Sequence, residues 1–277
     1  MMCVKNKFSE MLMAVLTWAA AVLTIGTLVF IVGFIFVKGV PYIKPSLFSL
    51  TYNSENVSLM PAMISTIMMT LLSLFIAAPL GIFAAIFLVE YAKRGNKIVG
   101  IMRMTTETLS GIPSIVYGLF GLLFFVTFLG WGFSVLAGAF TLAIMILPLI
   151  MRSSEEALKA VPDTYREGAF GLGAGKLRAV FRIILPSAMP GILAGIILSI
   201  GRIVGETAAL VYTAGTVAQI PTGPMQSART LSVHMYALSS EGLHTNEGYA
   251  TAVVLLLVVI LINTLSAKIA KRIGRMA

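Results

Sequence analysis

The stretch EGAFGLGAGKLRAVFRIILP, from Glu167 to Pro186, lies between two long hydrophobic segments of this chain. It combines an acidic first residue, closely spaced glycines and an Ile-x-Leu-Pro ending. This composition predicts a pair of short helices joined by a glycine-containing turn. The hydrophobic segments on both sides indicate that the pair connects two membrane-crossing helices.

The stretch resembles the EAA loop of ABC importer permeases. The pattern of that loop is Glu-Ala-Ala, three residues, Gly, nine residues and Ile-x-Leu-Pro. The residues at its positions here are Glu167, Gly168, Ala169, Gly173, Ile183, Leu185 and Pro186. Gly168 stands where the pattern has Ala and is the one departure. The resemblance implies that these residues couple the chain to a separate ATPase subunit.

The overall composition also indicates a membrane protein. Hydrophobic residues make up 58% of the 277 residues and charged residues 11%, whereas about a quarter of the residues in soluble domains are charged. A soluble fold of this length has no means of hiding so much apolar surface from water. We therefore predict an all-α membrane protein.

Six hydrophobic runs approach or exceed the roughly 20 residues that a helix needs to cross a bilayer core of about 30 Å. They cover residues 11–37, 61–89, 98–129, 133–150, 186–214 and 248–267. Residues 1–277 then form a single transmembrane domain, with a cytoplasmic loop at 151–185 and an outer loop at 215–247. Pro113 predicts a kink in the third run.

The basic residues set the orientation of these spans. Sixteen of the 20 Lys and Arg residues fall on one side of the predicted membrane, three fall on the other, and Arg202 lies inside a span. Because basic residues accumulate in cytoplasmic segments, we expect both termini in the cytoplasm. This topology explains the net charge of +9, so nucleic-acid binding is not inferred.

Several short motifs suggest chemistry that their context does not support. GLGAGK, ending at Lys176, lacks the spacing and the Ser/Thr of a phosphate-binding loop. His234 and His244 have no third ligand at metal spacing and are interpreted as surface residues. Cys3 is the single cysteine, and the first apolar run is too long for a cleaved signal peptide. We expect no cofactor, no metal and no enzymatic activity.

The fifth run contains the candidate transport site, in the segment GRIVGET that ends at Thr207. Arg202 and Glu206 are four residues apart, which places them on the same face of a helix. At about 1.5 Å per residue, Arg202 is expected about 24 Å along the helix from Pro186, near the middle of the bilayer. A charge there costs roughly 2.5–3.5 kcal/mol on insertion scales.

Two interpretations of this pair are open. In the first, the two charges neutralise each other and hold helices together. In the second, which we favour because ionisable residues inside membranes are functional by default, Arg202 offers its N–H donors to an oxyanion while Glu206 holds it in position. Thr207 is a further hydroxyl donor, or else it bonds its own helix backbone.

Three blocks carry a more specific resemblance. The segments GIPSIVYGLFG (Gly111–Gly121), GRIVGETAAL (Gly201–Leu210) and RTLSVHMYALSSEG (Arg229–Gly242) are similar to PstA-type permeases of bacterial and archaeal phosphate ABC importers. The similarity implies a type I importer permease fold, with six transmembrane helices and a cytoplasmic coupling helix. The family's anion-path arginine and glutamate carry over to Arg202 and Glu206.

The resemblance also implies a function and an assembly in the cell membrane. The chain would be the permease subunit of an ATP-driven importer of inorganic phosphate. Its partners would be a PstC-like permease, two copies of a PstB-like ATPase and an extracytoplasmic phosphate-binding protein that docks on the outer loop. Because one arginine balances only part of a phosphate charge of about −1.5, we expect a second arginine from the partner permease.

Two alternatives stay open at this point. An importer permease for molybdate, tungstate or sulfate would share the EAA loop and differ in the charged fifth span. A secondary transporter or channel without an ATPase would leave the stretch from Glu167 to Pro186 unexplained.

Overall fold

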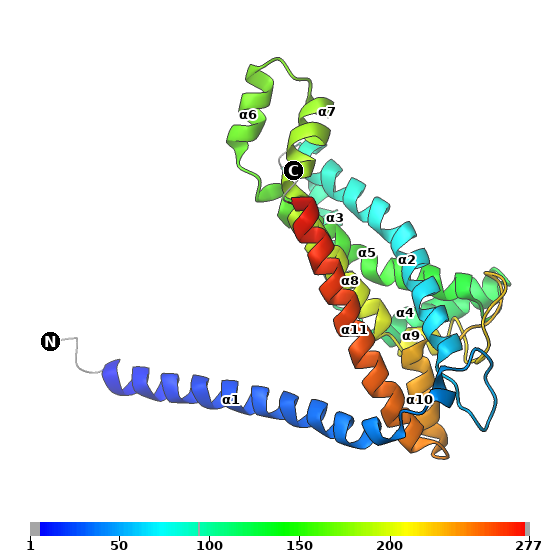
Figure 1. Cartoon of the computed structure of the whole chain (residues 1–277). Helices are drawn as coiled ribbons and strands as arrows, with labels where there is room; N and C mark the ends of the chain where they lie inside the picture. Colours follow the sequence, from blue (N-terminus) through cyan, green and yellow to red (C-terminus); the bar gives the residue numbers. More distant parts are fainter. Residues whose placement is uncertain (1–5, 94, 275–277) are drawn as a thin grey trace.

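The computed structural model describes residues 6–93 and 95–274, so Cys3 lies outside the described residues. This part of the chain is built from helices without a strand (Figure 1). The long helices are α1 (Asn6–Gly39), α2 (Met60–Ile86), α5 (Val135–Lys159), α8 (Leu185–Val204) and α11 (Thr245–Gly274). The shorter helices are α3 (Lys97–Ser110), α4 (Ser114–Gly121), α6 (Asp163–Gly171), α7 (Lys176–Ala179), α9 (Ala208–Val211) and α10 (Leu231–Glu241).

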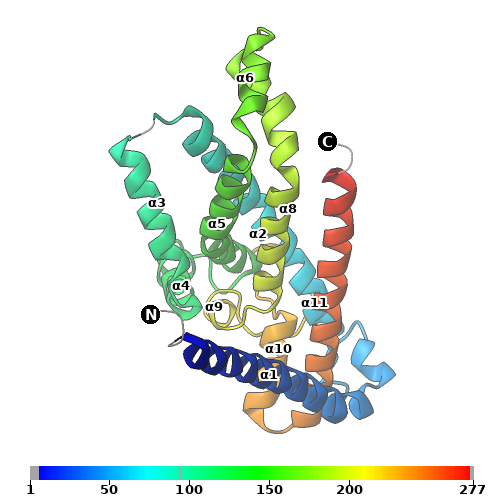
Figure 2. The same cartoon turned by 90° about the vertical axis from the view of Figure 1, so that its left-hand side faces the viewer.

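Helix α5 forms the centre of the bundle, with α2 and α8 packed along it (Figure 2). Leu142 and Ile146 of α5 are fully buried, and they belong to one hydrophobic cluster with Met69 of α2 and Ile203 of α8. Apolar side chains on the inner faces of three helices therefore make a continuous core. This core connects the two ends of the molecule at which the polar residues gather.

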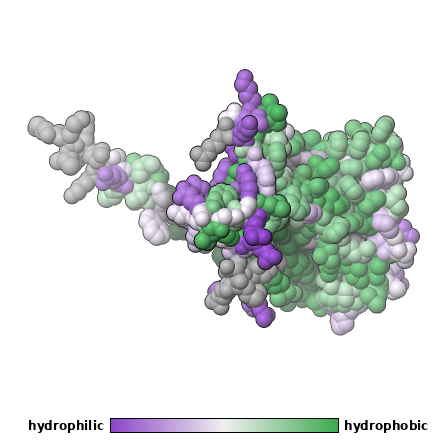
Figure 3. Space-filling model, turned by 90° about the horizontal axis from the view of Figure 1, so that it is seen from above, coloured by the Kyte–Doolittle hydropathy of each residue, from purple (hydrophilic) through white to green (hydrophobic). Residues whose placement is uncertain are grey.

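Among the described residues, five helices are long and apolar enough to cross a membrane, and a bent pair makes a sixth candidate. Many large apolar side chains on these helices are exposed, among them Phe75 and Phe128. From above, hydrophilic side chains gather on the end that carries α6, while a hydrophobic surface covers the body (Figure 3). An apolar exterior of this size suits contact with lipid and not with water.

The third apolar run is divided in two. Helix α3 ends at Ser110, α4 begins at Ser114, and the two axes differ in direction by 100°. Pro113 lies in the break, where it precedes the first residue of α4 and has no N–H to continue the α3 ladder. After α4 the helix continues as a π-helical segment, Leu122–Phe128. The kink predicted at Pro113 is present, and it is a sharp turn.

The fifth apolar run is helical over a different range from the expected 186–214. Its helix begins at Lys176, with a π-helical segment (Val180–Ile184) joining α7 to α8, and ends at Val204. Gly205 is its C-cap, a residue that commonly ends helices. The chain then starts the separate short helix α9.

The connection between α5 and the next long helix is correspondingly shorter than the predicted loop at 151–185. Helix α5 continues to Lys159 and the next long helix begins at Lys176, so α6 and two turns fill the interval. Figure 1 shows α6 projecting beyond the bundle, beside α7. A protruding helix joined to the core by two rigid helices suits contact with a second protein.

Helix α1 extends away from the other helices (Figure 1). It contacts the bundle near its end, where the ring of Phe34 packs edge-on against Tyr249 of α11 and Gly39 packs against the Tyr249 backbone. The rest of its apolar surface is exposed.

Candidate transport pathway and coupling loop

Two of the sequence blocks with family resemblance meet in space, because α4 packs against α9. A Cβ atom at Gly118 would lie 2.8 Å from the Cα of Ala209. One at Gly121 would collide with the side chains of Thr141 and Thr213. The two glycines therefore let the helices approach closely, which brings the third and fifth apolar runs together beside Arg202 and Glu206.

Arg202 lies in the last turn of α8 and is partly buried. Among the residues that the structure describes, none forms a hydrogen bond or ion pair with its guanidinium. The group is within electrostatic range of the Tyr117 hydroxyl on α4, which itself donates a hydrogen bond to the carbonyl of Leu109 at 2.7 Å. The donors of Arg202 thus remain available to an anion, beside a hydroxyl.

Glu206 does not pair with Arg202 as the sequence predicted. No ion pair within 4.0 Å joins them among the described residues. Glu206 is 8% exposed, and its carboxylate instead accepts the N–H of Ala209 at 3.0 Å, which caps α9. The prediction assumed one continuous helix, and Gly205 ends that helix between the two residues. The carboxylate fixes the start of α9, so it still shapes the segment that follows Arg202.

Most of the nearby hydroxyl groups donate hydrogen bonds to backbone carbonyls. Ser199 donates to the carbonyl of Gly195 at 2.9 Å and Thr213 to that of Ala209 at 2.8 Å. Thr207 reaches the carbonyl of Gly205 only at 3.5 Å, the weakest of the three. Of these hydroxyls, Thr207 is the one with most freedom to turn toward an anion.

The EAA-like stretch places its first residues on α6. Glu167 and Gly168 are exposed, whereas Ala169 is 4% exposed and faces the helix pair. Gly173 has a φ of +78° and follows the end of α6, where Ala174 donates its N–H to the carbonyl of Ala169. A left-handed residue after a helix end favours glycine, so the glycine of the pattern makes the turn between α6 and α7.

The last residues of the stretch join α7 to α8. Ile183 and Leu185 are partly buried, and Ile184 between them is 1% exposed in a second hydrophobic cluster. Pro186 directly follows the π-helical segment inside the continuous helix 176–204, where it has no N–H to continue the hydrogen-bond ladder. These residues fasten the EAA-like stretch to the long helix that carries Arg202.

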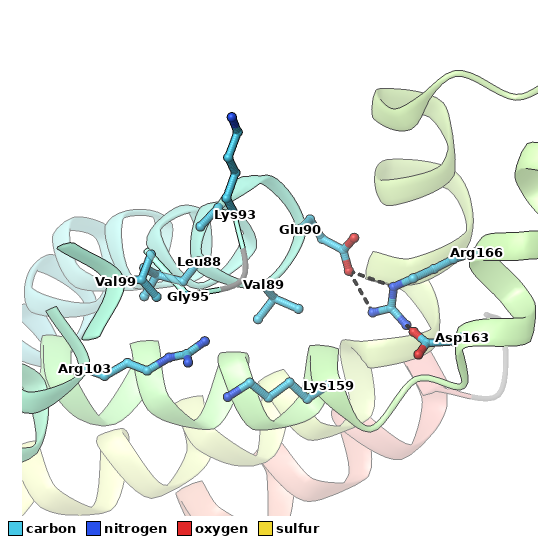
Figure 4. A pocket seen from close by; sticks show the side chains of 11 residues that line it. Leu88, Val89, Glu90, Lys93, Gly95, Val99, Arg103, Lys159, Asp163 and Arg166 are labelled. Carbon is cyan, nitrogen blue, oxygen red and sulfur yellow. Dashed lines mark hydrogen bonds and ion pairs between the residues drawn. The ribbon is translucent and has the colours of Figure 1, made fainter. Parts of the chain in front are cut away.

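Sequence reasoning missed Arg166, which connects α6 to the core (Figure 4). Its Nε and Nη2 both donate to Glu90 Oε1, at 3.1 and 2.7 Å. Its Nη groups also donate to the carbonyls of Leu158 and Val161 and to Asp163. Five hydrogen bonds from one guanidinium join the π-helical segment that continues α2 (Phe87–Tyr91), the end of α5 and the start of α6. No sequence signal pairs residues 90 and 166.

A polar cleft of about 460 Å³ lies beside Arg166 (Figure 4). Arg103 and Lys159 also line it, and each forms an ion pair at 2.7 Å with Glu155, whose side chain is 8% exposed. Most cations of this cleft are therefore held by carboxylates. The cleft is a structural feature of the end that carries α6, and its carboxylates make it unsuited to an anion.

In the part of the chain that the structure describes, no three His, Cys, Asp or Glu side chains form a group that could hold a metal ion.

The interpretation of His234 as a surface residue was wrong. This side chain is completely buried on α10, and its ring packs edge-on against Tyr52 with centroids 6.0 Å apart. The loop that contains Tyr52 covers it, a contact between distant parts of the sequence.

Comparison with known proteins places these features in context. Residues 77–275 match the model of the family described as binding-protein-dependent transport system inner membrane component. The probable ABC transporter permease protein YqgI of Bacillus subtilis is 37% identical over 62% of this chain and 63% of its own length. The phosphate transport system permease protein PstA of Pasteurella multocida is 36% identical over 76% of this chain and 75% of its own.

The fold has solved counterparts. A chain of a bacterial alginate ABC transporter, in complex with an alginate pentasaccharide-bound periplasmic protein, superposes with a TM-score of 0.67. The alignment covers 96% of this chain and 94% of that one, with 17% sequence identity. At this identity the match concerns the fold, which is that of ABC importer permeases.

Proposed function

Because the chain belongs to the family of binding-protein-dependent transport system inner membrane components, we propose that it is the permease subunit of an ATP-driven importer of inorganic phosphate. The observation that carries the phosphate assignment is the 36% identity to a phosphate transport permease across about three quarters of both chains. The unpaired Arg202 supports it, since an unneutralised guanidinium suits an oxyanion.

The proposed assembly contains three kinds of partner. A homologous PstC-like permease completes the pathway, two copies of a PstB-like ATPase bind at the cytoplasmic end, and an extracytoplasmic phosphate-binding protein docks at the outer end. Both termini lie in the cytoplasm, as the distribution of basic residues predicts. ATP hydrolysis takes place on the ATPase subunits, so this chain is a transport subunit and not an enzyme.

Arg202, Glu206 and Thr207 form this chain's share of the pathway. Arg202 binds two oxygens of the anion through its planar donors. Glu206 acts indirectly, by fixing the first turn of α9 through the Ala209 N–H. A second arginine from the partner permease completes the neutralisation of the phosphate charge.

Movement of α6 opens and closes the transport pathway. The exposed face that carries Glu167 and Gly168 seats in a groove of the ATPase, as a helix-in-groove contact. Arg166 transmits the displacement, since its hydrogen bonds fasten α6 to the ends of α2 and α5. Ala169, Gly173, Ile183, Leu185 and Pro186 maintain the rigid connection to α8, which carries Arg202.

The test of this function is uptake of labelled oxyanions by cells that lack their own high-affinity systems. The cells express the chain with its permease, ATPase and binding-protein partners. We expect ATP-dependent uptake of phosphate, abolished by a catalytically inactive ATPase partner. Uptake of molybdate, tungstate or sulfate instead would refute the phosphate assignment, and uptake that persists with the inactive ATPase would favour a secondary transporter or channel.

A further inference from the structure

Arg229 is a buried cation without a counter-charge. It lies in the outer loop, two residues before the first residue of α10, and is 6% exposed. Its Nε has no solvent exposure and no hydrogen-bond partner. Among the described residues, no carboxylate lies within 4.0 Å of its guanidinium. The group instead lies over the ring of Tyr52, with 5.1 Å between Cζ and the ring centroid.

His234 is a second buried polar group at the same place. Neither ring nitrogen has a hydrogen-bond partner of ordinary geometry. Burial lowers the pKa of this imidazole to about 4, the charge of Arg229 lowers it too, and a hydrogen-bonding contact with the Val57 backbone raises it. His234 is therefore neutral near pH 7, and it neither repels an anion nor neutralises one. A neutral imidazole still has one N–H to donate.

The two side chains together indicate a missing negative group. A buried charge is unfavourable unless it is paired, and buried polar atoms normally have hydrogen-bond partners. Three of the orphaned buried atoms in the described part of the chain belong to Arg229 and His234. Glu206 does not serve as the counter-charge, because it lies beyond ion-pair distance and already accepts the Ala209 N–H.

The position of α10 places this cluster beside the proposed pathway. The Ser232 hydroxyl donates to the backbone carbonyl of Glu206 at 2.6 Å, and the Leu231 N–H donates to the Thr66 hydroxyl at 2.8 Å. The first turn of α10 is thus fixed against the segment that follows Arg202. Tyr52, which covers Arg229, belongs to the helix-free segment 49–59 and is itself partly exposed.

We propose that Arg229 and the N–H of His234, covered by Tyr52, bind a tetrahedral oxyanion at the outer entrance of the pathway. The donors of Arg229 contact two oxygens of the anion. The identification of the anion as phosphate rests on the proposed function. The chain then supplies two successive cation sites, with Arg229 receiving the anion before Arg202.

The test uses the purified complex of this chain with its partner permease and ATPase, without the binding protein. All samples carry Arg202→Gln, which removes the other unpaired cation of the pathway. The probe is inorganic phosphate, with chloride at equal ionic strength as the control, and the readout is the midpoint of thermal unfolding. We expect phosphate to raise the midpoint by a few degrees, because a ligand that binds only the folded state stabilises it.

Arg229→Met should abolish this rise, and without phosphate its midpoint should equal or exceed that of the parent, because an apolar side chain replaces an unpaired charge. Arg229→Lys should keep a smaller rise, since an ammonium lacks the planar donors. His234→Phe should also reduce it. If the Arg229→Met complex fails to assemble, the Arg229→Lys and His234→Phe variants decide whether this site binds phosphate.

A phosphate-dependent rise that persists in Arg229→Met, or that is unchanged in both Arg229→Lys and His234→Phe, would overturn the proposal. So would the absence of a rise in the parent complex at any phosphate concentration. An Arg229-dependent rise with sulfate or molybdate but not phosphate would support the oxyanion site while refuting the phosphate importer. The experiment therefore distinguishes a failure of the proposed oxyanion site from a failure of the phosphate assignment.

Discussion

Two groups of basic residues are held differently. At the end of the bundle that carries α6, Arg166 is bound by Glu90 and Asp163, and Arg103 and Lys159 share Glu155. Arg202, in the last turn of α8, and Arg229, just before α10, have no carboxylate partner among the described residues. The ion pairs join helices to one another, whereas the guanidinium groups of Arg202 and Arg229 keep donors available. In the proposed function, the first group belongs to the coupling contacts and the second to the anion pathway.

The largest expected effect comes from breaking the paired end. Arg166→Ala leaves the carboxylate of Glu90, 7% exposed, without its partner, and we expect a loss of about 3–5 kcal/mol in unfolding free energy. The complex should also hydrolyse ATP with little uptake of phosphate. Stability and the ratio of uptake to ATP hydrolysis are the two measurements.

The matched control is Arg152→Ala, which removes an exposed pair with Glu156 on the same end of the molecule. Such pairs contribute about 1 kcal/mol or less. Equal effects of the two substitutions would contradict a special role for Arg166.

The second prediction concerns the contact between α4 and α9 at the outer end. Gly118→Ala places a methyl group against the backbone of Ala209, and overpacking of this kind costs about 1–3 kcal/mol. Because α9 would shift together with the Glu206 turn, uptake should fall as well. Gly100→Ala on α3 is the control, since no atom lies within 4 Å of its new Cβ. A similar loss in both variants would show that the contact has no special importance.

The third prediction tests the turn of the coupling loop. Gly173→Ala forces a φ of +78° on a residue with a Cβ, at a cost of about 1–2 kcal/mol. Gly168→Ala, in open space on α6, should instead preserve or raise stability and coupling. Thermal unfolding of the two variants compares them directly, and a stable Gly173→Ala protein would mean that the turn is free to rearrange.

The smallest effect on stability is expected for Glu206→Gln. The amide oxygen still accepts the Ala209 N–H, so the unfolding free energy should change by about 1 kcal/mol or less. Because the cap of α9 is kept, uptake of phosphate should stay close to that of the parent complex. A large loss of uptake by an assembled Glu206→Gln complex would show that the negative charge itself is required, and not only the cap.

The sequence predicted the fold class well where its signals were local. Apolar runs, the Ile-x-Leu-Pro ending and the left-handed Gly173 are all properties of neighbouring residues. The limits of the fifth helix were less predictable, because its C-cap, Gly205, lies inside an apolar run that continues beyond it. The expected pairing of Arg202 with Glu206 was wrong for this reason.

Contacts between distant parts of the chain were not predictable from the sequence. The partnership of Arg166 with Glu90 spans 76 residues, and no spacing rule connects them. Arg229 was counted only as an outer-loop charge, because its burial depends on Tyr52, far away in the sequence. Both contacts arise from the packing of helices against loops, which the order of residues along the chain does not specify.

The most direct test is labelled phosphate uptake with Arg202→Gln, compared with Arg152→Gln near the end of α5. Both variants lose one positive charge, but of these two arginines only Arg202 lacks a carboxylate partner among the described residues. The account predicts that uptake collapses in Arg202→Gln while the complex stays assembled, and that Arg152→Gln transports normally. Unimpaired uptake by an assembled Arg202→Gln complex would contradict it.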